Sequence, residues 1–187
     1  MHHPDHRRAE AAAPVCRIAH TPGGVTQAVA LRPLDERDGA VLDGVFAGLS
    51  ATSRYLRFHA GTPRMTTAVR ARLAAVDGFD HIAVGAFTGD DEPLGIARLI
   101  RVGPGRAELA VEVVDAWQGR GIGTRMVRAV VELGAAAGIT EVVAEVLAGN
   151  RAAQRLLAAT FPQLTAVRSG TETTFLARVP GRVPAAA

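Results

Sequence analysis

The sequence contains no lysine, and all 21 of its basic residues are arginine. The absence excludes a phosphate-binding loop of the GxxxxGK[ST] type and any enzyme that forms a Schiff base on a lysine. It also accounts for the isoelectric point of 10.3, because arginine stays protonated far above neutral pH while the net charge is only +3. No basic run is longer than Arg7-Arg8, so the sequence indicates no nucleic-acid partner.

Cysteine, aromatic residues and long apolar runs are also scarce. The single cysteine, Cys16, excludes an intramolecular disulfide and a multi-cysteine zinc site, and we expect no metal. No apolar run reaches the ~18 residues of a membrane span, and no signal peptide is recognisable. These absences predict a cytoplasmic protein with no membrane partner. Apolar residues make up 48% of the chain and aromatic residues 4%, which predicts a core of aliphatic side chains.

The length of the chain suits one domain. We expect a flexible leader over residues 1–24, a single domain over 25–180 and a flexible tail over 181–187. The order of periodic segments predicts a mixed sheet, since an antiparallel meander is followed by a strand–helix–strand crossover. Predicted strands cover 25–34, 81–87, 93–102, 106–114, 141–147, 164–169 and 173–179. Predicted helices begin at Asp35, Ser50 to Ser53, Thr66 or Thr67, the loop 118–123 and Asn150.

A glycine-punctuated loop is the most informative stretch. In ELAVEVVDAWQGRGIGT, residues 108–124, a strand leads into Gly119, Gly121 and Gly123, where a helix begins. Such a loop presents several backbone N–H groups beside a helix N-terminus, which suits a pyrophosphate. The dinucleotide fingerprint GxGxxG is not met, because position 124 is threonine. A glycine turn without a ligand is the alternative.

The loop and a downstream helix together resemble the Gcn5-related N-acetyltransferase (GNAT) family. Gln118 to Gly123 match its cofactor loop, Q/R-x-x-G-x-G/A, and Asn150, Ala153, Leu157 and Thr160-Phe161 follow its later pattern. The resemblance covers about residues 25–180. It implies an α/β (α+β) fold with a mixed, mostly antiparallel, twisted sheet of about seven strands flanked by helices.

The resemblance also implies a co-substrate and a site. Acetyl-CoA would bind between the strand ending near Val114 and the strand 141–147, and its acetyl group would pass directly to an amine. The backbone of Val113 and Val114 would hold the pantetheine arm, and Asn150 would lie beside the departing sulfur. The loop residues implied to bind the pyrophosphate are Gln118, Gly119, Arg120, Gly121, Ile122, Gly123 and Thr124. The arginines nearest in sequence for the phosphates are Arg120, Arg125, Arg151 and Arg155.

The reaction needs a base, because an amine must be neutral to attack. Alternation places Glu108 and Glu112 on one face of their strand. Glu108 stands where many relatives keep a glutamate that acts through water, and Glu112 is the second candidate. Burial would raise the carboxylate pKa and favour this role. Either glutamate could instead only pair with an arginine. Leu157 occupies the position where relatives often place a tyrosine that protonates the leaving thiolate.

The acceptor remains open at this point. Ser50 to His59 resembles the protein-acetylating branch of the family, which implies a protein lysine. A small amine, such as an aminoglycoside, polyamine or amino acid, is the second hypothesis, with an acidic groove supplied by Asp77, Asp80, Asp90, Asp91 and Glu92. A non-catalytic acyl-CoA-binding sensor is the third, because of Leu157. Relatives often pair through their last strands, so a homodimer is also an expectation.

Overall fold

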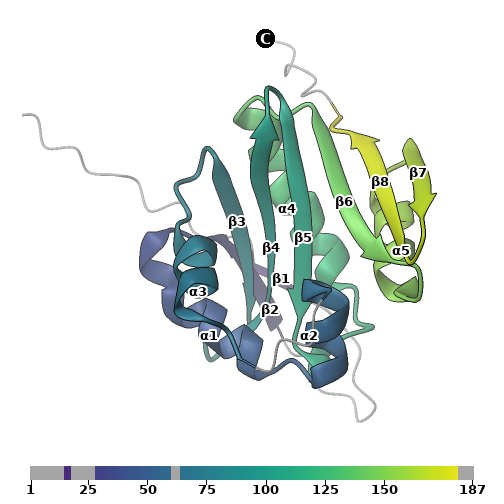
Figure 1. Ribbon diagram of the computed structural model, residues 1–187. Helices are drawn as coiled ribbons and strands as arrows, with labels where there is room; N and C mark the ends of the chain where they lie inside the picture. The colour runs from purple at the N-terminus through teal and green to yellow at the C-terminus, as the bar shows by residue number, and fades with distance from the viewer. Residues whose placement is uncertain (1–14, 18–27, 60–63, 181–187) are drawn as a thin grey trace, which may run out of the picture.

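A computed structural model describes residues 15–17, 28–59 and 64–180 (Figure 1). These residues form one sheet of eight strands in the order β1-β2-β3-β4-β5-β6-β8-β7. The strands are β1 Val15–Arg17, β2 Ala28–Pro33, β3 His81–Phe87, β4 Pro93–Gly103, β5 Arg106–Val113, β6 Glu141–Leu147, β7 Leu164–Ser169 and β8 Glu172–Arg178. The helices are α1 Gly39–Ala47, α2 Ala51–Phe58, α3 Thr67–Ala74, α4 Ile122–Ala136 and α5 Arg151–Thr160, with short 3-10 turns at Glu36–Asp38 and Asp115–Trp117.

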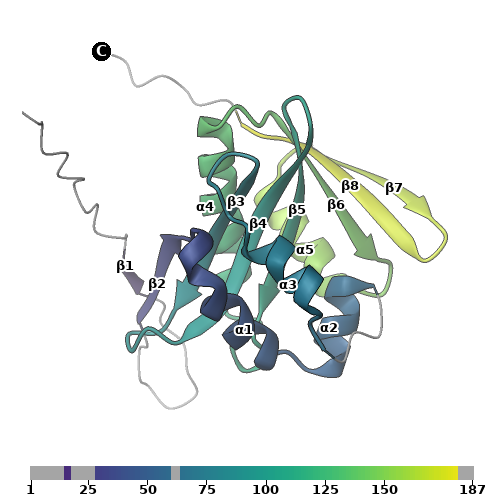
Figure 2. The ribbon, with the colours of Figure 1, turned by 60° about the vertical axis from the view of Figure 1, so that its left-hand side comes forward.

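The sheet is mixed, as the sequence predicted. Only β5 and β6 run parallel, and α4 makes the crossover between them. All other neighbouring strands are antiparallel. Helices α1, α2 and α3 lie on one face of the sheet, and α4 and α5 lie on the other (Figures 1 and 2).

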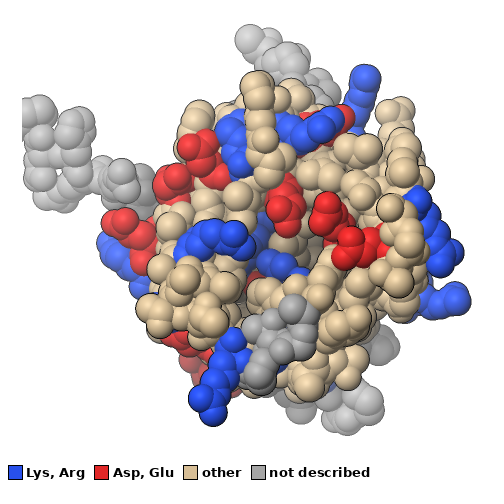
Figure 3. Space-filling view, in the orientation of Figure 1, with Lys and Arg blue, Asp and Glu red and all other residues tan. Residues whose placement is uncertain are grey.

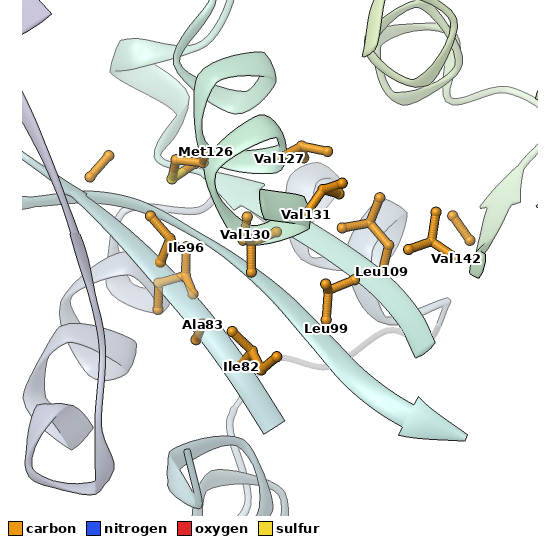
Figure 4. Packing of buried hydrophobic residues seen from close by; sticks show 14 of the residues in the cluster. Ile82, Ala83, Ile96, Leu99, Leu109, Met126, Val127, Val130, Val131 and Val142 are labelled. Carbon is orange, nitrogen blue, oxygen red and sulfur yellow. The ribbon is translucent and has the colours of Figure 1, made fainter. Parts of the chain in front are cut away.

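The core is aliphatic and centres on α4. This helix carries Met126, Val127, Val130 and Val131 on one face, at the spacing of an amphipathic helix, and all four are buried. They pack over side chains of β3, β4 and β5 (Figure 4). A Cβ on Gly134 would lie 2.6 Å from a methyl group of Leu99, so only glycine allows α4 to approach β4 this closely.

Beyond one-residue shifts at strand ends, two segments differ from the sequence-based prediction. Val15–Arg17 lie in the predicted leader, yet they form β1 and pair with β2, where Cys16 lies opposite Val29. Three residues are too few to show an alternating pattern, so this strand had no signal of its own. The helix predicted from Asp35 begins as a 3-10 turn, because the Asp35 and Asp38 carboxylates accept backbone N–H groups in a capping box before α1 starts. Residues 25–27 of the first predicted strand lie outside the described residues.

None of the helices in the described part of the chain combines the length and apolarity that crossing a membrane requires.

Candidate active site

A cleft opens where β5 and β6 separate. Their ladder joins only Arg106–Glu108 to Glu141–Val143, and no further pairs follow among the described residues, although both strands continue. The opening has a volume of about 650 Å³ and is lined from both faces of the sheet, by α2 on one side and by α4 and α5 on the other. Openings of this size typically hold a small-molecule ligand.

The backbone of β5 faces this opening at Val113. The N–H of Val114 donates to the Leu94 carbonyl at 2.9 Å, and its carbonyl accepts from Trp117 N–H at 2.9 Å, so both backbone groups of Val114 are already engaged. Strand alternation then directs Val113 away from β4 and toward β6. The Val113 carbonyl accepts from the Gln118 side chain at 3.0 Å. Of the two predicted backbone ligands, Val113 therefore still offers its N–H to the cleft.

Hydrogen bonds from the Gln118 side chain hold the start of the glycine loop in place. Besides the Val113 carbonyl, its Nε2 lies 3.2 Å from Ser53 Oγ and 3.1 Å from the Asp115 carboxylate. The side chain thus joins the loop to the end of β5 and to α2. We assign Gln118 a positioning role, and Ser53 is a contributor to the site that no sequence motif indicated.

The glycine loop forms an anion cradle at the N-terminus of α4. Gly119 and Gly121 have φ of 74° and 76°, a left-handed conformation that strongly favours glycine. Gly121 is the N-cap and supplies no side-chain cap, so the first N–H groups of α4, at Ile122, Gly123 and Thr124, remain available to a ligand. A Cβ on Gly123 would lie 2.7 Å from Leu156, so glycine there permits close packing of α4 on α5. This geometry suits a pyrophosphate.

The arginines named for the CoA phosphates have different surroundings. Arg120 stacks on Trp117, with its guanidinium 4.6 Å from the ring centre, and donates to the Ala116 carbonyl at 3.1 Å. Arg125 donates to the Val29 carbonyl at 3.4 Å. Of the four candidates, Arg155 alone is among the residues that line the cleft in the described part of the chain.

If the loop binds acetyl-CoA as the sequence predicts, replacing Gly121 with alanine should weaken that binding about fivefold. A left-handed conformation costs a non-glycine residue roughly 1 kcal/mol, and the loop would relax away from the cradle geometry. Isothermal titration calorimetry measures the dissociation constant. The control is Gly89→Ala, in the turn after β3, where φ is not left-handed and no atom lies within 4 Å of the added Cβ. Equal affinities for the two variants would show that the loop geometry does not govern binding.

Asn150 and Leu157 line the far wall of the cleft. The Asn150 Oδ1 caps α5 by accepting from Ala153 N–H at 3.1 Å, which leaves Nδ2 to donate to a ligand. Leu157 is buried, with 4% of its surface exposed, and brings no proton donor to the wall. Any proton for a leaving thiolate must therefore come from another side chain or from water.

Glu112 is a buried structural anion. Its Oε1 lies 2.6 Å from Arg98 Nη2 and its Oε2 lies 2.6 Å from Arg57 Nε. Burial alone would raise the pKa of Glu112, but the two guanidinium groups outweigh burial and hold the pKa below its ordinary value. The expectation that burial would raise the pKa of this carboxyl is therefore wrong for Glu112, and the residue is poorly suited to accept a proton.

Glu108 lies on the same face of β5 but is exposed to the cleft. The strand pairing shows which residues of β6 and β8 share this face. Glu108 pairs with Val143 of β6, and Glu145 and Leu147 follow on the same face at steps of two residues. Leu147 in turn pairs with Glu172 of β8. Glu108 and Glu145 line the cleft, Glu172 lies next to them at the start of β8, and these three carboxylates form what we call the acidic floor. Figure 3 shows acidic side chains gathered over β5 and β6 on this face. No motif pointed to Glu145 or Glu172, because only strand pairing places them beside Glu108.

The acidic groove predicted from Asp77, Asp80, Asp90, Asp91 and Glu92 is wrong, because none of these residues lines the cleft. They flank the two ends of β3, a strand of about 20 Å, so they cannot form one surface. The Asp77 carboxylate accepts three backbone N–H groups in its own turn, and Asp80 pairs with Arg101.

A histidine also enters the site. His59 lines the cleft, and its Nδ1 lies 2.9 Å from Oε1 of Glu172.

Within the described residues, no group of three or more histidine, cysteine, aspartate or glutamate side chains is placed to hold a metal ion.

Comparisons with known proteins identify the family and the fold. Residues 51–161 match the sequence model of the acetyltransferase (GNAT) family. The GNAT domain of the S. lividans protein acetyltransferase PAT is 25% identical with a TM-score of 0.74, over 88% of this chain and 96% of that one. A cAMP-binding acyltransferase from Mycobacterium smegmatis is 26% identical with a TM-score of 0.58, over 92% of this chain but 50% of its own. Spermidine N-acetyltransferase from Vibrio cholerae, in complex with CoA and spermine, shares the fold at 12% identity, with a TM-score of 0.63 over 81% of this chain and 95% of that one. No curated protein sequence matches the chain.

Proposed function

The chain belongs to the GNAT acetyltransferase family and is an acyltransferase, and on this basis we propose that it transfers an acetyl group from acetyl-CoA directly to a primary amine. The observation that carries the proposal is the separation of β5 from β6. It opens a cleft through the sheet with an anion cradle on the α4 face and an acidic floor on the opposite face.

The groups on the α4 face of the cleft would bind the different parts of acetyl-CoA. The cradle N–H groups of Ile122, Gly123 and Thr124 take the pyrophosphate. The Val113 N–H and the Asn150 Nδ2 bind the pantetheine end and orient the thioester. Acetyl-CoA supplies an activated acyl group, so the chain needs no nucleophile of its own.

The acidic floor receives the amine. Carboxylates attract an ammonium group, and Glu108 removes one of its protons through water so that the nitrogen lone pair is free to attack. Glu108 has no ion-pair partner in the described part of the chain. Glu112, in contrast, is already bound by two arginines and serves as an anchor beneath the site.

We propose a protein lysine as the acceptor. The support is the likeness of the Ser50 to His59 segment to the protein-acetylating branch, together with the similarity to the PAT domain over most of both chains. A small polyamine is the second candidate, and Glu108 and Glu145, the two carboxylates of the acidic floor that line the cleft, are the observation that favours it.

Release of free thiol from acetyl-CoA tests the proposal. We expect release with a lysine-bearing protein substrate, such as an acyl-CoA synthetase, and less with spermidine or free amino acids. Because the chain has no lysine, every N-ε-acetyl group that mass spectrometry detects must belong to the acceptor. Acetyl-CoA binding without thiol release against a broad panel of proteins and amines would instead indicate a non-catalytic sensor.

A further inference from the structure

The pair formed by His59 and Glu172 joins the two sides of the cleft. His59 directly follows α2, whereas Glu172 is the first residue of β8, which lies beyond β6. The two residues are 113 positions apart in the sequence, and their side chains meet at 2.9 Å. Helix α2 has no fully buried residue; Phe58 packs against the core and against Phe46, and the His59–Glu172 contact adds a polar tie at the end of the helix.

The register of the sheet places this pair along the cleft. Glu108 pairs with Val143, and four residues further on the two strands reach Glu112 and Leu147. Leu147 pairs with Glu172. The His59–Glu172 pair therefore lies level with the end of β5, about 13 Å along the strands from Glu108.

The end of β5 is where the thioester is expected. The Asn150 N–H donates to the Leu147 carbonyl at 2.8 Å, so Asn150 is close to the strand residue that pairs with Glu172. His59, Val113 and Asn150 all line the same cleft. The imidazole thus lines the cleft on the face assigned to the amine, at the level along the strands of the groups assigned to the thioester.

The backbone at His59 has a conformation that is uncommon for a residue with a Cβ. Its φ of 54° and ψ of 20° are left-handed, and glycine is the common choice just after a helix. A left-handed conformation is strained for a residue with a Cβ. Such a conformation, at a residue that lines a cleft, points to a functional use of the side chain.

The hydrogen bond to Glu172 sets the tautomer of the ring. An ionised carboxylate can only accept, so the proton between the two groups belongs to His59 Nδ1. The Nε2 atom of the neutral ring then carries a lone pair and can accept a proton. Glu172 also stabilises the imidazolium that forms when Nε2 is protonated.

We propose that His59, oriented by Glu172, carries the second proton of the acetyl transfer. This inference rests on the proposed function. An ammonium acceptor loses two protons on becoming an amide, and Glu108 removes the first before attack. As the N–C bond forms, Nε2 of His59 accepts the second proton from nitrogen. As the C–S bond breaks, the same proton passes to the departing sulfur, which leaves as the free thiol. His59 thereby supplies the donor that Leu157 cannot.

The variant His59→Asn distinguishes proton transfer by His59 from a purely structural role of its contact with Glu172. Asparagine tolerates the left-handed conformation and can donate its amide N–H to Glu172, but it cannot accept and return a proton. We expect kcat to fall about 100-fold while the dissociation constant of acetyl-CoA stays within about twofold of the wild-type value. Tyr55→Phe is the matched control, since Tyr55 lies one turn earlier, on α2, is exposed and does not line the cleft.

Glu172→Gln tests whether the pair acts as one unit. We expect this variant to lose about tenfold or more in kcat, and the double variant to lose no more than His59→Asn alone. A kcat for His59→Asn within about threefold of the wild type, a loss of acetyl-CoA binding in that variant, or losses that multiply in the double variant would each overturn the inference. Absence of thiol release by the wild-type protein would instead count against the proposed function.

Discussion

Replacing Arg98 with methionine should lower the free energy of unfolding by about 3 kcal/mol. The Arg98 side chain is 1% exposed, donates to the Leu73 carbonyl at 3.2 Å and pairs with Glu112, whose side chain is 3% exposed. Methionine fills similar space but leaves a buried carboxylate with Arg57 as its one remaining cation. Removing one member of a buried pair is costly because the other charge stays away from water.

Urea unfolding at several pH values measures the effect. In the wild type, burial would raise the pKa of Glu112, but Arg98 and Arg57 hold it below the ordinary value. Its stabilising contribution is therefore present above the unfolded-state pKa and is lost as the pH falls through the lower folded-state pKa. Without Arg98 the folded-state pKa rises, so protonation relieves the unpaired charge earlier. The deficit of Arg98→Met should shrink as the pH falls below about 5.

Two further variants identify the source of the loss. Arg70→Met removes an arginine from an exposed pair with Asp43 and should leave the unfolding midpoint nearly unchanged, because water screens that pair. Arg98→Met combined with Glu112→Met removes both buried charges and should recover part of the stability. A deficit that does not change with pH would mean that lost packing, rather than charge, dominates.

The fold was largely predictable because its signals are local. The strands His81–Phe87, Glu141–Leu147 and Leu164–Ser169 have the predicted bounds, since turn residues bracket each β-rich run. Ser50 and Thr66 cap α2 and α3 as expected, because a side-chain oxygen accepts an N–H three residues on.

The candidate site was predictable only in part. The glycine loop and Asn150 follow from residues adjacent in the sequence. The partners of Glu112 do not, because Arg57 is 55 residues away and reaches the carboxylate only once α2 lies on the sheet. The acidic floor could not be predicted from the sequence either, because Glu172 comes near Glu145 only when β6 and β8 pair in the sheet. Tertiary pairing assembles the side that we propose for the amine acceptor, whereas local sequence encodes the side that we propose for acetyl-CoA.

Replacing Glu108 with glutamine should lower kcat by about 100-fold to 1,000-fold while leaving the affinity for acetyl-CoA unchanged. Glutamine keeps the size of the side chain but cannot take a proton from the acceptor. Glu108 lies on the face that we propose to bind the amine, away from the α4 cradle, so acetyl-CoA binding should not change. Thiol release under saturating acetyl-CoA measures kcat, and calorimetry measures the affinity.

The matched control is Glu145→Gln. Glu145 is an exposed carboxylate on the same face of the adjacent strand and lines the same cleft, so its removal changes the charge of the floor equally. If the floor only attracts the ammonium group, both variants should raise the acceptor KM and neither should lower kcat. If Glu108 is the base, its variant alone should lose kcat. The loss of kcat in Glu108→Gln should also become smaller toward pH 10. The amine of a lysine side chain has an ordinary pKa of about 10.4, so more of the acceptor is already neutral there and needs no base. Equal kcat losses in the two variants, or a loss for Glu108→Gln that does not change with pH, would remove Glu108 from the role of base.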